Sequence, residues 1–428
     1  MFAAPADPKV LVFEDARRTV EEHAARVQPP AAECVELLDA AGRVLAEPVT
    51  ADRDFPPFPR ATRDGYAVRS SDLSQIPAKL DVVGEIKAGE QAEKIPAVAR
   101  GRAVSIMTGA PVPAGADAVV MVEYTSRRGN AVEITKSVAP GENIVPRGAE
   151  AGHGSLLLDR GQRLNAPAIA LAASGGKSQL QVSLRPRVAV LATGDEVVDI
   201  NSLPGPAQIR NSNTYSLAAQ IGEAGGEPVL LPIAPDEPHA LRRLIEQGLA
   251  SDLLLITGGV SMGRYDLVEQ VLAEMQAEFF FTGAQIQPGR PVVFGRCDKS
   301  KTGAGTRGSG IPARGRGQYF FGLPGNPVST MVTFDLFVAP MLAALAGAFP
   351  RKLTFLHARL KSDIRVKTGL KRFLPAMLTG EFENSVVELV PWQGSGDIAA
   401  TARANCYVVI PPDRAHISAG DWVAVMPR

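Results

Sequence analysis

The stretch that decides the fold is Arg187-Val188-Ala189-Val190-Leu191-Ala192-Thr193-Gly194-Asp195-Glu196, an apolar run that breaks at a polar turn containing glycine. The same pattern recurs at 252–259, where Thr257-Gly258-Gly259 forms the break, and at 318–327, where the break ends in Pro324-Gly325-Asn326-Pro327. Short, continuously apolar runs of this kind are typical of strands in a parallel sheet that is covered on both faces.

Amphipathic helices are expected between these strands. Four apolar residues within 241–249 recur at helical spacing, after a cap-like Asp236 and Pro238, and a second such pattern at 267–272 follows Asp266. Strands that alternate with helices predict a doubly wound α/β domain, in which ligands bind beyond the carboxyl ends of the strands. We therefore expect the three glycine-rich breaks to meet at one rim, which is the candidate active site.

The whole chain has 428 residues, with 45 Lys+Arg against 45 Asp+Glu, and this balance argues against a general nucleic-acid or acidic-membrane binder. Its three cysteines are too far apart for a disulfide framework or a zinc site, and the N-terminus lacks a secretory signal, so we expect a cytoplasmic protein. The longest apolar run, near 337–349, is too short to span a bilayer and predicts a buried helix.

The sequence predicts five regions. Residues 1–50 are expected to be a helical segment that packs with 149–184; this prediction includes a second helical stretch at Cys34, Leu37 and Leu38, after Pro29-Pro30. A β-rich lobe at 51–148 precedes the helical and linker segment 149–184. The α/β domain covers 185–349, and a C-terminal β domain covers 350–428. Residues 299–317, rich in glycine and cations, predict a flexible insertion between two strands.

Glycine-rich turns between a strand and a helix present backbone N–H groups and a positive helix end to an anion. Gly325-Asn326-Pro327 followed by Ser329 fits such a phosphate or oxyanion site. Asp195, Glu196 and Asp266 follow the strands and would stand beside that anion. Because Mg²⁺ binds a few carboxylates together with phosphate oxygens and water, the pattern favours a magnesium-assisted phosphate reaction.

A rival interpretation is a serine hydrolase. Residues 259–263 match the G-x-S-x-G turn of such enzymes, with Ser261 as the nucleophile. The connection between strand and serine is longer than that turn requires, and the histidines downstream, His357 and His416, lie in the C-terminal β domain. We therefore rank this alternative lower.

Five motifs occur in the order seen in one family. They are Asp64-Gly65-Tyr66-Ala67, Thr108 to Pro113, Thr193 to Glu196, Thr257 to Ser261 with Asp266, and Gly322 to Ser329. In this the chain resembles the molybdopterin molybdenumtransferases, which are the MoeA proteins and the E domain of gephyrin. The resemblance implies a central MoCF-type α/β domain and a β-barrel-like C-terminal domain. It also implies an enzyme that inserts molybdenum from molybdate into adenylylated molybdopterin, uses Mg²⁺ and releases AMP.

The resemblance also implies roles for particular residues. Asp64, Thr108, Glu196 and Asp266 would be catalytic, with Glu196 and Asp266 as the Mg²⁺ ligands. Substrate or anion binding would fall to Thr193, Gly194, Asp195, Asp236, Gly258, Gly259, Ser261, Arg290, Pro324, Gly325, Asn326, Pro327, Ser329, Arg372 and Ser395. A homodimer with shared active sites is implied, as are molybdopterin adenylyltransferase and apo-molybdoenzymes as partners.

Two positions depart from the family pattern. The family commonly has Lys-Pro-Gly-Lys-Pro where this chain has Gln287-Pro288-Gly289-Arg290-Pro291, and a Glu-Asp pair where it has Ala149-Glu150. One cation is lost and another becomes arginine, which binds oxyanions through a planar fork. The alternative function on the same fold is a non-catalytic scaffold that binds a pterin or a nucleotide, because a fold alone does not establish activity. Nothing in the sequence distinguishes molybdenum from tungsten.

Overall fold

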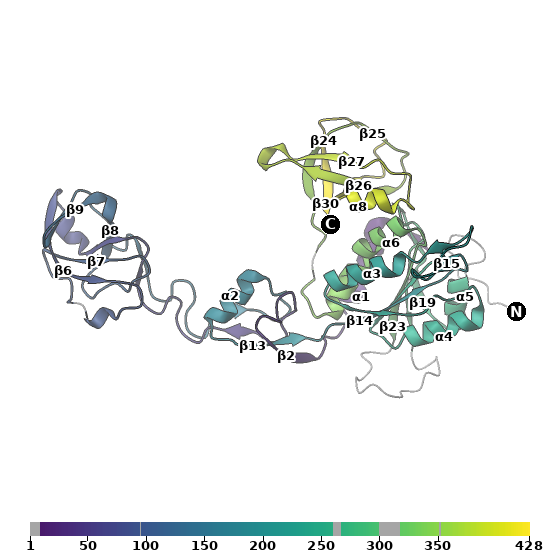
Figure 1. The fold of residues 1–428 in the computed structure, drawn as a ribbon, viewed down its shortest axis with the longest axis horizontal. Helices are drawn as coiled ribbons and strands as arrows, with labels where there is room; N and C mark the ends of the chain where they lie inside the picture. The colour runs from purple at the N-terminus through teal and green to yellow at the C-terminus, as the bar shows by residue number, and fades with distance from the viewer. Residues whose placement is uncertain (1–8, 95, 260–266, 299–316, 351) are drawn as a thin grey trace.

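The computed structural model describes residues 9–428 except 95, 260–266, 299–316 and 351. The molecule is elongated (Figure 1). The β-rich lobe lies at one end, a small module with β2, β13 and α2 lies in the middle, and the α/β domain lies at the other end beside the C-terminal β domain.

The central sheet has six strands in the order β17-β14-β18-β23-β22-β19. Its parallel part is β17 (Glu227–Leu230), β14 (Arg187–Ala192), β18 (Leu253–Thr257) and β23 (Gln318–Leu323). The three strands predicted from the apolar runs are thereby confirmed. Strand β22 (Val293–Cys297) runs antiparallel to β23, and the edge strand β19 (Glu278–Phe281) runs antiparallel to β22, so the sheet is mixed.

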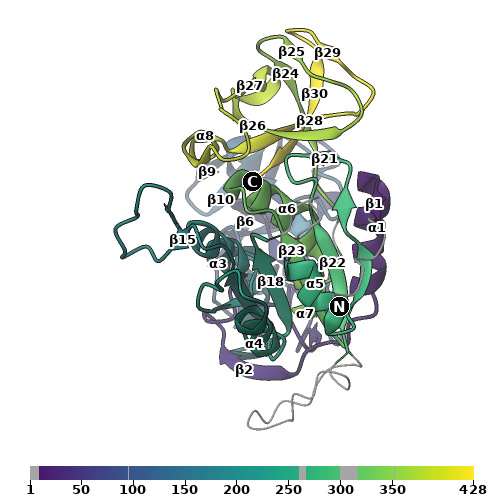
Figure 2. The same ribbon diagram turned by 90° about the vertical axis from the view of Figure 1, so that its right-hand side faces the viewer.

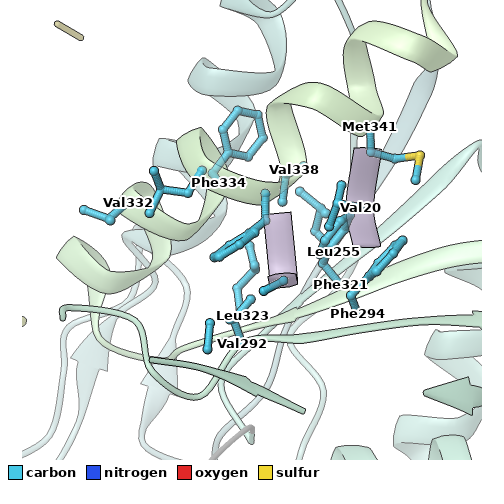
Figure 3. Close-up of a cluster of buried hydrophobic side chains, with 14 of the residues drawn as sticks. Val20, Leu255, Val292, Phe294, Phe321, Leu323, Val332, Phe334, Val338 and Met341 are labelled. Atoms are coloured by element: carbon cyan, nitrogen blue, oxygen red, sulfur yellow. The ribbon is translucent and has the colours of Figure 1, made fainter. Parts of the chain in front are cut away.

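Helices cover both faces of this sheet. Leu255 and Phe321 lie on the side of the long C-terminal helix of the domain, as Figure 3 shows. Helix α3 (Asn213–Glu223) contributes Leu217 and Ile221 to the same cluster. Leu254 and Phe320 pack on the opposite face, against α4 (Pro238–Gly248) and α5 (Leu267–Glu274). The prediction that Asp236 caps α4 was wrong, because the Glu237 side chain accepts the N–H groups of residues 239 and 240.

The apolar run near 337–349 belongs to a longer helix than expected. It comprises α6 (Pro327–Thr333), the π-helical η4 (Phe334–Val338) and α7 (Ala339–Leu345). Over Pro327–Leu345 this helix is long and apolar enough to cross a membrane, but 72% of its most apolar window is buried inside the protein. It is the core helix of the α/β domain (Figure 3).

The N-terminal segment divides between two neighbours. Strand β1 (Val10–Leu11) pairs with β20 (Gly283–Ala284), and α1 (Phe13–Ala24) packs on the α/β domain, where the Phe13 and Phe337 rings lie 6.0 Å apart. The second helical stretch was predicted wrongly. Ala32–Glu36 form β2, which pairs with β13 (Gln179–Ser183), because alternating burial suits a strand at the surface. Helix α2 (Ala166–Ser174) is confirmed.

The β-rich lobe contains a six-stranded sheet. Its order is β8 (Ala118–Met121), β5 (Gly65–Val68), β7 (Arg102–Ile106), β6 (Ala78–Ile86), β10 (Ala131–Ile134) and β9 (Thr125–Arg128). Short pairs join the neighbouring segments: β3 (Val49–Thr50) with β12 (Leu156–Leu158), and β4 (Arg60–Ala61) with β11 (Ile144–Val145). The 3₁₀ turns are η1 (Ser70–Leu73), η2 (Ala92–Lys94) and η3 (Val122–Tyr124).

The C-terminal domain is a closed barrel. Its five strands are β24 (Leu356–Leu360), β26 (Lys371–Thr379), β27 (Val386–Leu389), β28 (Cys406–Ile410) and β30 (Trp422–Pro427), and the pairing of β26 with β28 closes the sheet. Beside it lie β25 (Ile364–Arg365) with β29 (His416–Ile417), η5 (Phe382–Asn384) and α8 (Ile398–Arg403). Strand β21 (Ile286–Gln287) extends from the α/β domain onto β26 and ties the two domains together.

Candidate functional site

The three glycine-rich breaks meet at the carboxyl edge of the parallel strands. The Thr193 N–H donates to the Thr257 carbonyl at 3.0 Å, and the Thr257 hydroxyl donates to the Pro324 carbonyl at 3.2 Å. The side-chain amide of Asn213, the first residue of α3, donates to Thr257 Oγ1 at 2.9 Å and to the Gly325 carbonyl at 2.7 Å. Four chain segments are therefore joined into one polar rim.

This rim lies at a topological switch point. From β14 the chain runs through α3 to β17 on one side, and later returns through α4 to β18 on the other side of β14. The two crossover helices pack on opposite faces of the sheet. In open α/β sheets the crevice beyond such a reversal is the usual ligand position.

Gly258 has a structural requirement at this point. Its φ is +88°, and a Cβ atom there would lie 2.5 Å from the Thr193 carbonyl oxygen. Any larger residue would push the β14 and β18 loops apart, so glycine allows the two strand ends to approach closely.

Carboxylates gather on the β14 side of the rim. The Asp236 N–H donates to Asp195 Oδ1 at 3.1 Å. Burial, followed by the charges of Asp195 and Glu196, raises the pKa of Asp236 above its ordinary value. Two predicted site residues, Ser261 and Asp266, lie outside the described residues, and within the described part of the chain no three metal-ligating side chains converge.

The predicted anion turn at the start of α6 is partly used by the protein itself. Pro327 has no N–H, and the Val328 N–H donates to the Ser395 carbonyl of the C-terminal domain at 3.0 Å. Thr330 Oγ1 donates to the Pro324 carbonyl at 2.5 Å, and Ser329 is 4% exposed. Ser395, predicted as a substrate contact, touches this turn through its backbone.

A buried arginine lies on the strand that pairs with the segment packed on this helix. Gln287 of β21 is paired with Arg372 of β26, and two residues after Gln287 a Cβ atom at Gly289 would lie 2.5 Å from Thr333 Cγ2 of α6. Arg372 is 6% exposed, its guanidinium donates to the Leu370 carbonyl at 3.2 Å, and it has no carboxylate partner in the part of the chain that the structure describes. Burial lowers the pKa of Arg372. Arg290 is exposed.

The other predicted half of the site lies in the β-rich lobe. Both the backbone N–H and the hydroxyl of Thr108 donate to Asp64 Oδ1 at 2.7 Å, and these hydrogen bonds lower the pKa of Asp64. Both residues are exposed. The lobe and the α/β domain stand at opposite ends of the long axis (Figure 1), so the lobe of one chain lies away from the rim of its own α/β domain. Figure 2, turned by 90°, shows the barrel beside α6.

Asn213 and Thr257 were missed as functional residues in the sequence. The polar run Asn211-Ser212-Asn213-Thr214 could have indicated a polar helix start near the rim. The position of Asn213 at the rim depends on the crossover that places α3 beside β18, and a local sequence pattern does not reveal that crossover.

Together these features define a ligand-binding α/β domain accompanied by β-rich accessory domains. Family models match almost the whole chain: the MoeA N-terminal region (domain I and II) at 11–176, a "Probable molybdopterin binding domain" at 189–344, and the MoeA C-terminal region (domain IV) at 357–427. The chain belongs to the MoeA family.

Relatives support this over the full length. The chain is 36% identical to the molybdopterin molybdenumtransferase of a Nostoc species over 404 residues, which cover 92% of this chain and 88% of that protein. It is 32% identical to the protein of that name in Staphylococcus aureus, over 92% of this chain and 90% of that protein. A solved molybdopterin biosynthesis MoeA protein from Pyrococcus horikoshii has a TM-score of 0.75 and 27% identity, covering 98% of this chain and all of that one (100%).

Proposed function

We propose that this chain is a molybdopterin molybdenumtransferase. It inserts molybdenum from molybdate into adenylylated molybdopterin and releases AMP, a late step of molybdenum cofactor synthesis. One observation carries the proposal: the chain matches relatives of that name over 92% of its length. The polar rim at the switch point, where substrates of α/β domains bind, supports it.

On this proposal the rim holds the adenylylated pterin. Thr193, Gly258 and Gly325 bring three backbone segments close enough to surround a ligand at the strand ends. Molybdate binds near the α6 turn, where the buried Arg372 guanidinium and the Ser329 hydroxyl supply hydrogen-bond donors and Arg290 supplies a second cation. A buried arginine without a carboxylate partner favours an oxyanion, because its charge is otherwise uncompensated.

Magnesium fits the carboxylate side of the rim. Asp195, Glu196 and Asp236 offer hard oxygen donors. Burial, and then the charges of Asp195 and Glu196, raise the pKa of Asp236, and a divalent cation would relieve that repulsion. Glu196 would hold the ion together with Asp266. When bound, Mg²⁺ neutralises charge that builds on the phosphate oxygens. One or two carboxylates suffice, since substrate phosphates and water supply the remaining ligands.

A second copy of the chain completes the site. The lobe that contains Asp64 and Thr108 stands at the opposite end of the chain from the α/β domain (Figure 1), so the lobe of one protomer serves the rim of the other across a two-fold axis. We place this homodimer in the cytoplasm. Molybdopterin adenylyltransferase supplies its substrate, and apo-molybdoenzymes receive its product.

The scaffold alternative, in which the fold binds a pterin or a nucleotide without turnover, predicts binding of the substrate but no AMP release. The hydrolase alternative loses support, because His416 Nε2 lies 3.0 Å from Asp363 Oδ2 on the surface of the barrel domain.

The experiment is AMP release from adenylylated molybdopterin with molybdate and Mg²⁺. We expect Glu196→Gln to lower the rate at limiting Mg²⁺ by roughly 10²-fold or more. The matched control is Glu227→Gln, which removes an exposed carboxylate at the amino edge of the same sheet. No AMP release by the wild-type protein would contradict the proposed function. Equal rates in both variants would contradict the role of Glu196.

A further inference from the structure

Two buried oxygen atoms at the rim have no hydrogen-bond partner among the described residues. They are Thr193 Oγ1 and Asn213 Oδ1. The third such atom, Gln220 Oε1, lies deeper in the α/β domain, beside Asp335. Most buried polar groups in native proteins are paired, so two unpaired oxygens in one place need an explanation.

Both side chains lie near the Gly258–Gly259 turn, Asn213 through its hydrogen bond to the preceding Thr257. A Cβ atom at Gly259 would lie 2.8 Å from Thr193 Oγ1, and one at Gly325 would lie 3.6 Å from the Cα atom of Gly258. The Asn213 amide is anchored on Gly325 through its Nδ2 atom at 2.7 Å, and this fixes which of its two polar atoms remains unpaired. The Thr193 hydroxyl and the Asn213 side-chain amide therefore lie at the same glycine turn, at the switch point between β14 and β18.

The chemistry of the pair selects its ligand. Asn213 Oδ1 can only accept hydrogen bonds, and Thr193 Oγ1 can accept as well as donate. Molybdate and the diphosphate linkage of the adenylylated substrate carry no hydrogen at neutral pH, so the Asn213 oxygen does not bind them. A group with N–H donors, such as the amino and ring N–H groups of a pterin or the amino group of adenine, satisfies both oxygens.

We infer that Thr193 Oγ1 and Asn213 Oδ1 form an acceptor subsite for the N–H groups of the substrate's heterocycle, separate from the anion-binding part of the rim. The inference rests on the proposed function, which supplies a substrate with two such heterocycles. Both oxygens are shielded by the surrounding turns, so the Gly258–Gly259 turn, where both φ angles are positive, moves when the heterocycle binds.

The first test uses Thr193→Val, which keeps the shape of the side chain and removes the unpaired oxygen. Because no bond is lost in the free protein, we expect the Tm of the full chain to rise by about 2–4 °C. The matched control is Thr214→Val in the same domain, where the hydroxyl accepts from Asn211 Nδ2 at 2.9 Å. This variant should lower the Tm, since it leaves a buried donor unpaired. A lower Tm for Thr193→Val would overturn the inference by showing that the oxygen is already paired.

The second test measures binding to the full-length protein by calorimetry. The probes are pterin against lumazine, which has a carbonyl in place of the pterin amino group, and AMP against inosine monophosphate, which lacks the adenine amino group. We expect Thr193→Val to weaken one amino-bearing probe roughly tenfold and its partner far less. The pair whose discrimination disappears identifies the heterocycle that the subsite binds.

Molybdate is the third probe, and its binding should not change in Thr193→Val. Unchanged discrimination in both pairs, or weaker molybdate binding alone, would overturn the acceptor subsite. Neither result depends on turnover, so the subsite fails or holds independently of the AMP-release assay that tests the proposed function.

Discussion

The two predicted halves of the site differ in how their polar groups are satisfied. In the lobe, the exposed Asp64 accepts two hydrogen bonds from Thr108, and its pKa is lowered. At the rim, Thr193 and Asn213 keep unpaired oxygens, and burial and neighbouring charges raise the pKa of Asp236. In the lobe, the Asp64 carboxylate is already stabilised by its neighbour Thr108. The rim half has uncompensated polar groups and charges, which agrees with the proposal that the substrate and Mg²⁺ bind there.

The largest expected effect tests whether the halves belong to different chains. Asp64→Ala and Glu196→Gln should each abolish AMP release alone. In a mixed dimer with cross-chain sites, one site collects both lesions and the other collects none. Mixing the two inactive proteins, with subunit exchange allowed, should therefore restore up to about a quarter of the wild-type rate, since half of the dimers are mixed and each has one intact site of two.

The control is a mixture of Asp64→Ala with Glu196→Gln in which exchange is blocked by cross-linking before mixing. If mass spectrometry confirms mixed dimers and no AMP is released, each site is built within one chain. The proposal that the lobe of one protomer completes the rim of the other would then be wrong.

The next effect concerns the helices behind the rim. Asp335, in the π-helical turn of the core helix, accepts from Gln220 of α3 at 2.8 Å and lies 3.4 Å from the Tyr407 hydroxyl of the barrel. Burial raises the pKa of Asp335 to about 6. Since the folded pKa lies above the unfolded value, stability is greatest below about pH 4 for this group, and on the order of 3 kcal/mol is lost as the pH rises through 6.

We therefore expect Asp335→Asn to be more stable than the wild type at about pH 7.5 and equally stable near pH 4, measured by urea unfolding. A destabilised variant at the higher pH would show that the charged form, through Arg428, supports the junction of core helix and barrel. The lobe offers no such buried carboxyl among its described residues, so the effect distinguishes the two regions.

The sequence predicted the parts of this site that depend on local patterns. The apolar runs and the breaks at Thr193, Gly258 and Gly325 located the strands and their polar ends, because a strand and the turn that ends it are formed by consecutive residues. It missed β2, where alternation in a short surface strand resembles a helix face, and it missed Asn213. Positions of that kind are set by pairing between distant segments: β2 with β13, and α3 with β18 and β23.

A smaller effect is expected at Gln287, whose β-ladder partner is Arg372. Gln287→Lys places a second cation near the proposed molybdate position and should lower the molybdate concentration needed for half-maximal insertion roughly threefold to tenfold. The control is Gln285→Lys, which adds the same charge at an exposed position two residues earlier. An unchanged molybdate dependence would indicate that Arg290 already supplies the charge.

The smallest effect compares the two half-sites directly. Asp236→Asn removes a repelled carboxylate from the rim, and Asp64→Asn removes a stabilised one from the lobe while the amide oxygen can still accept from Thr108. At about pH 7.5 the rim variant should gain a few tenths of a kcal/mol, because exposed charges are screened, and the lobe variant should lose stability. As the pH falls, Asp236 is neutralised before Asp64 because its pKa is raised, and the stability gained by Asp236→Asn disappears with its charge.

Asp64 stays charged to lower pH, so its variant still differs in stability from the wild type near pH 4. Amide hydrogen exchange, measured separately for the lobe and the α/β domain, reports the change in local stability in each variant. If both variants shift stability in the same direction, the carboxylates of the rim and of the lobe are equally well compensated by their surroundings. The contrast that supports ligand binding at the rim would then be wrong.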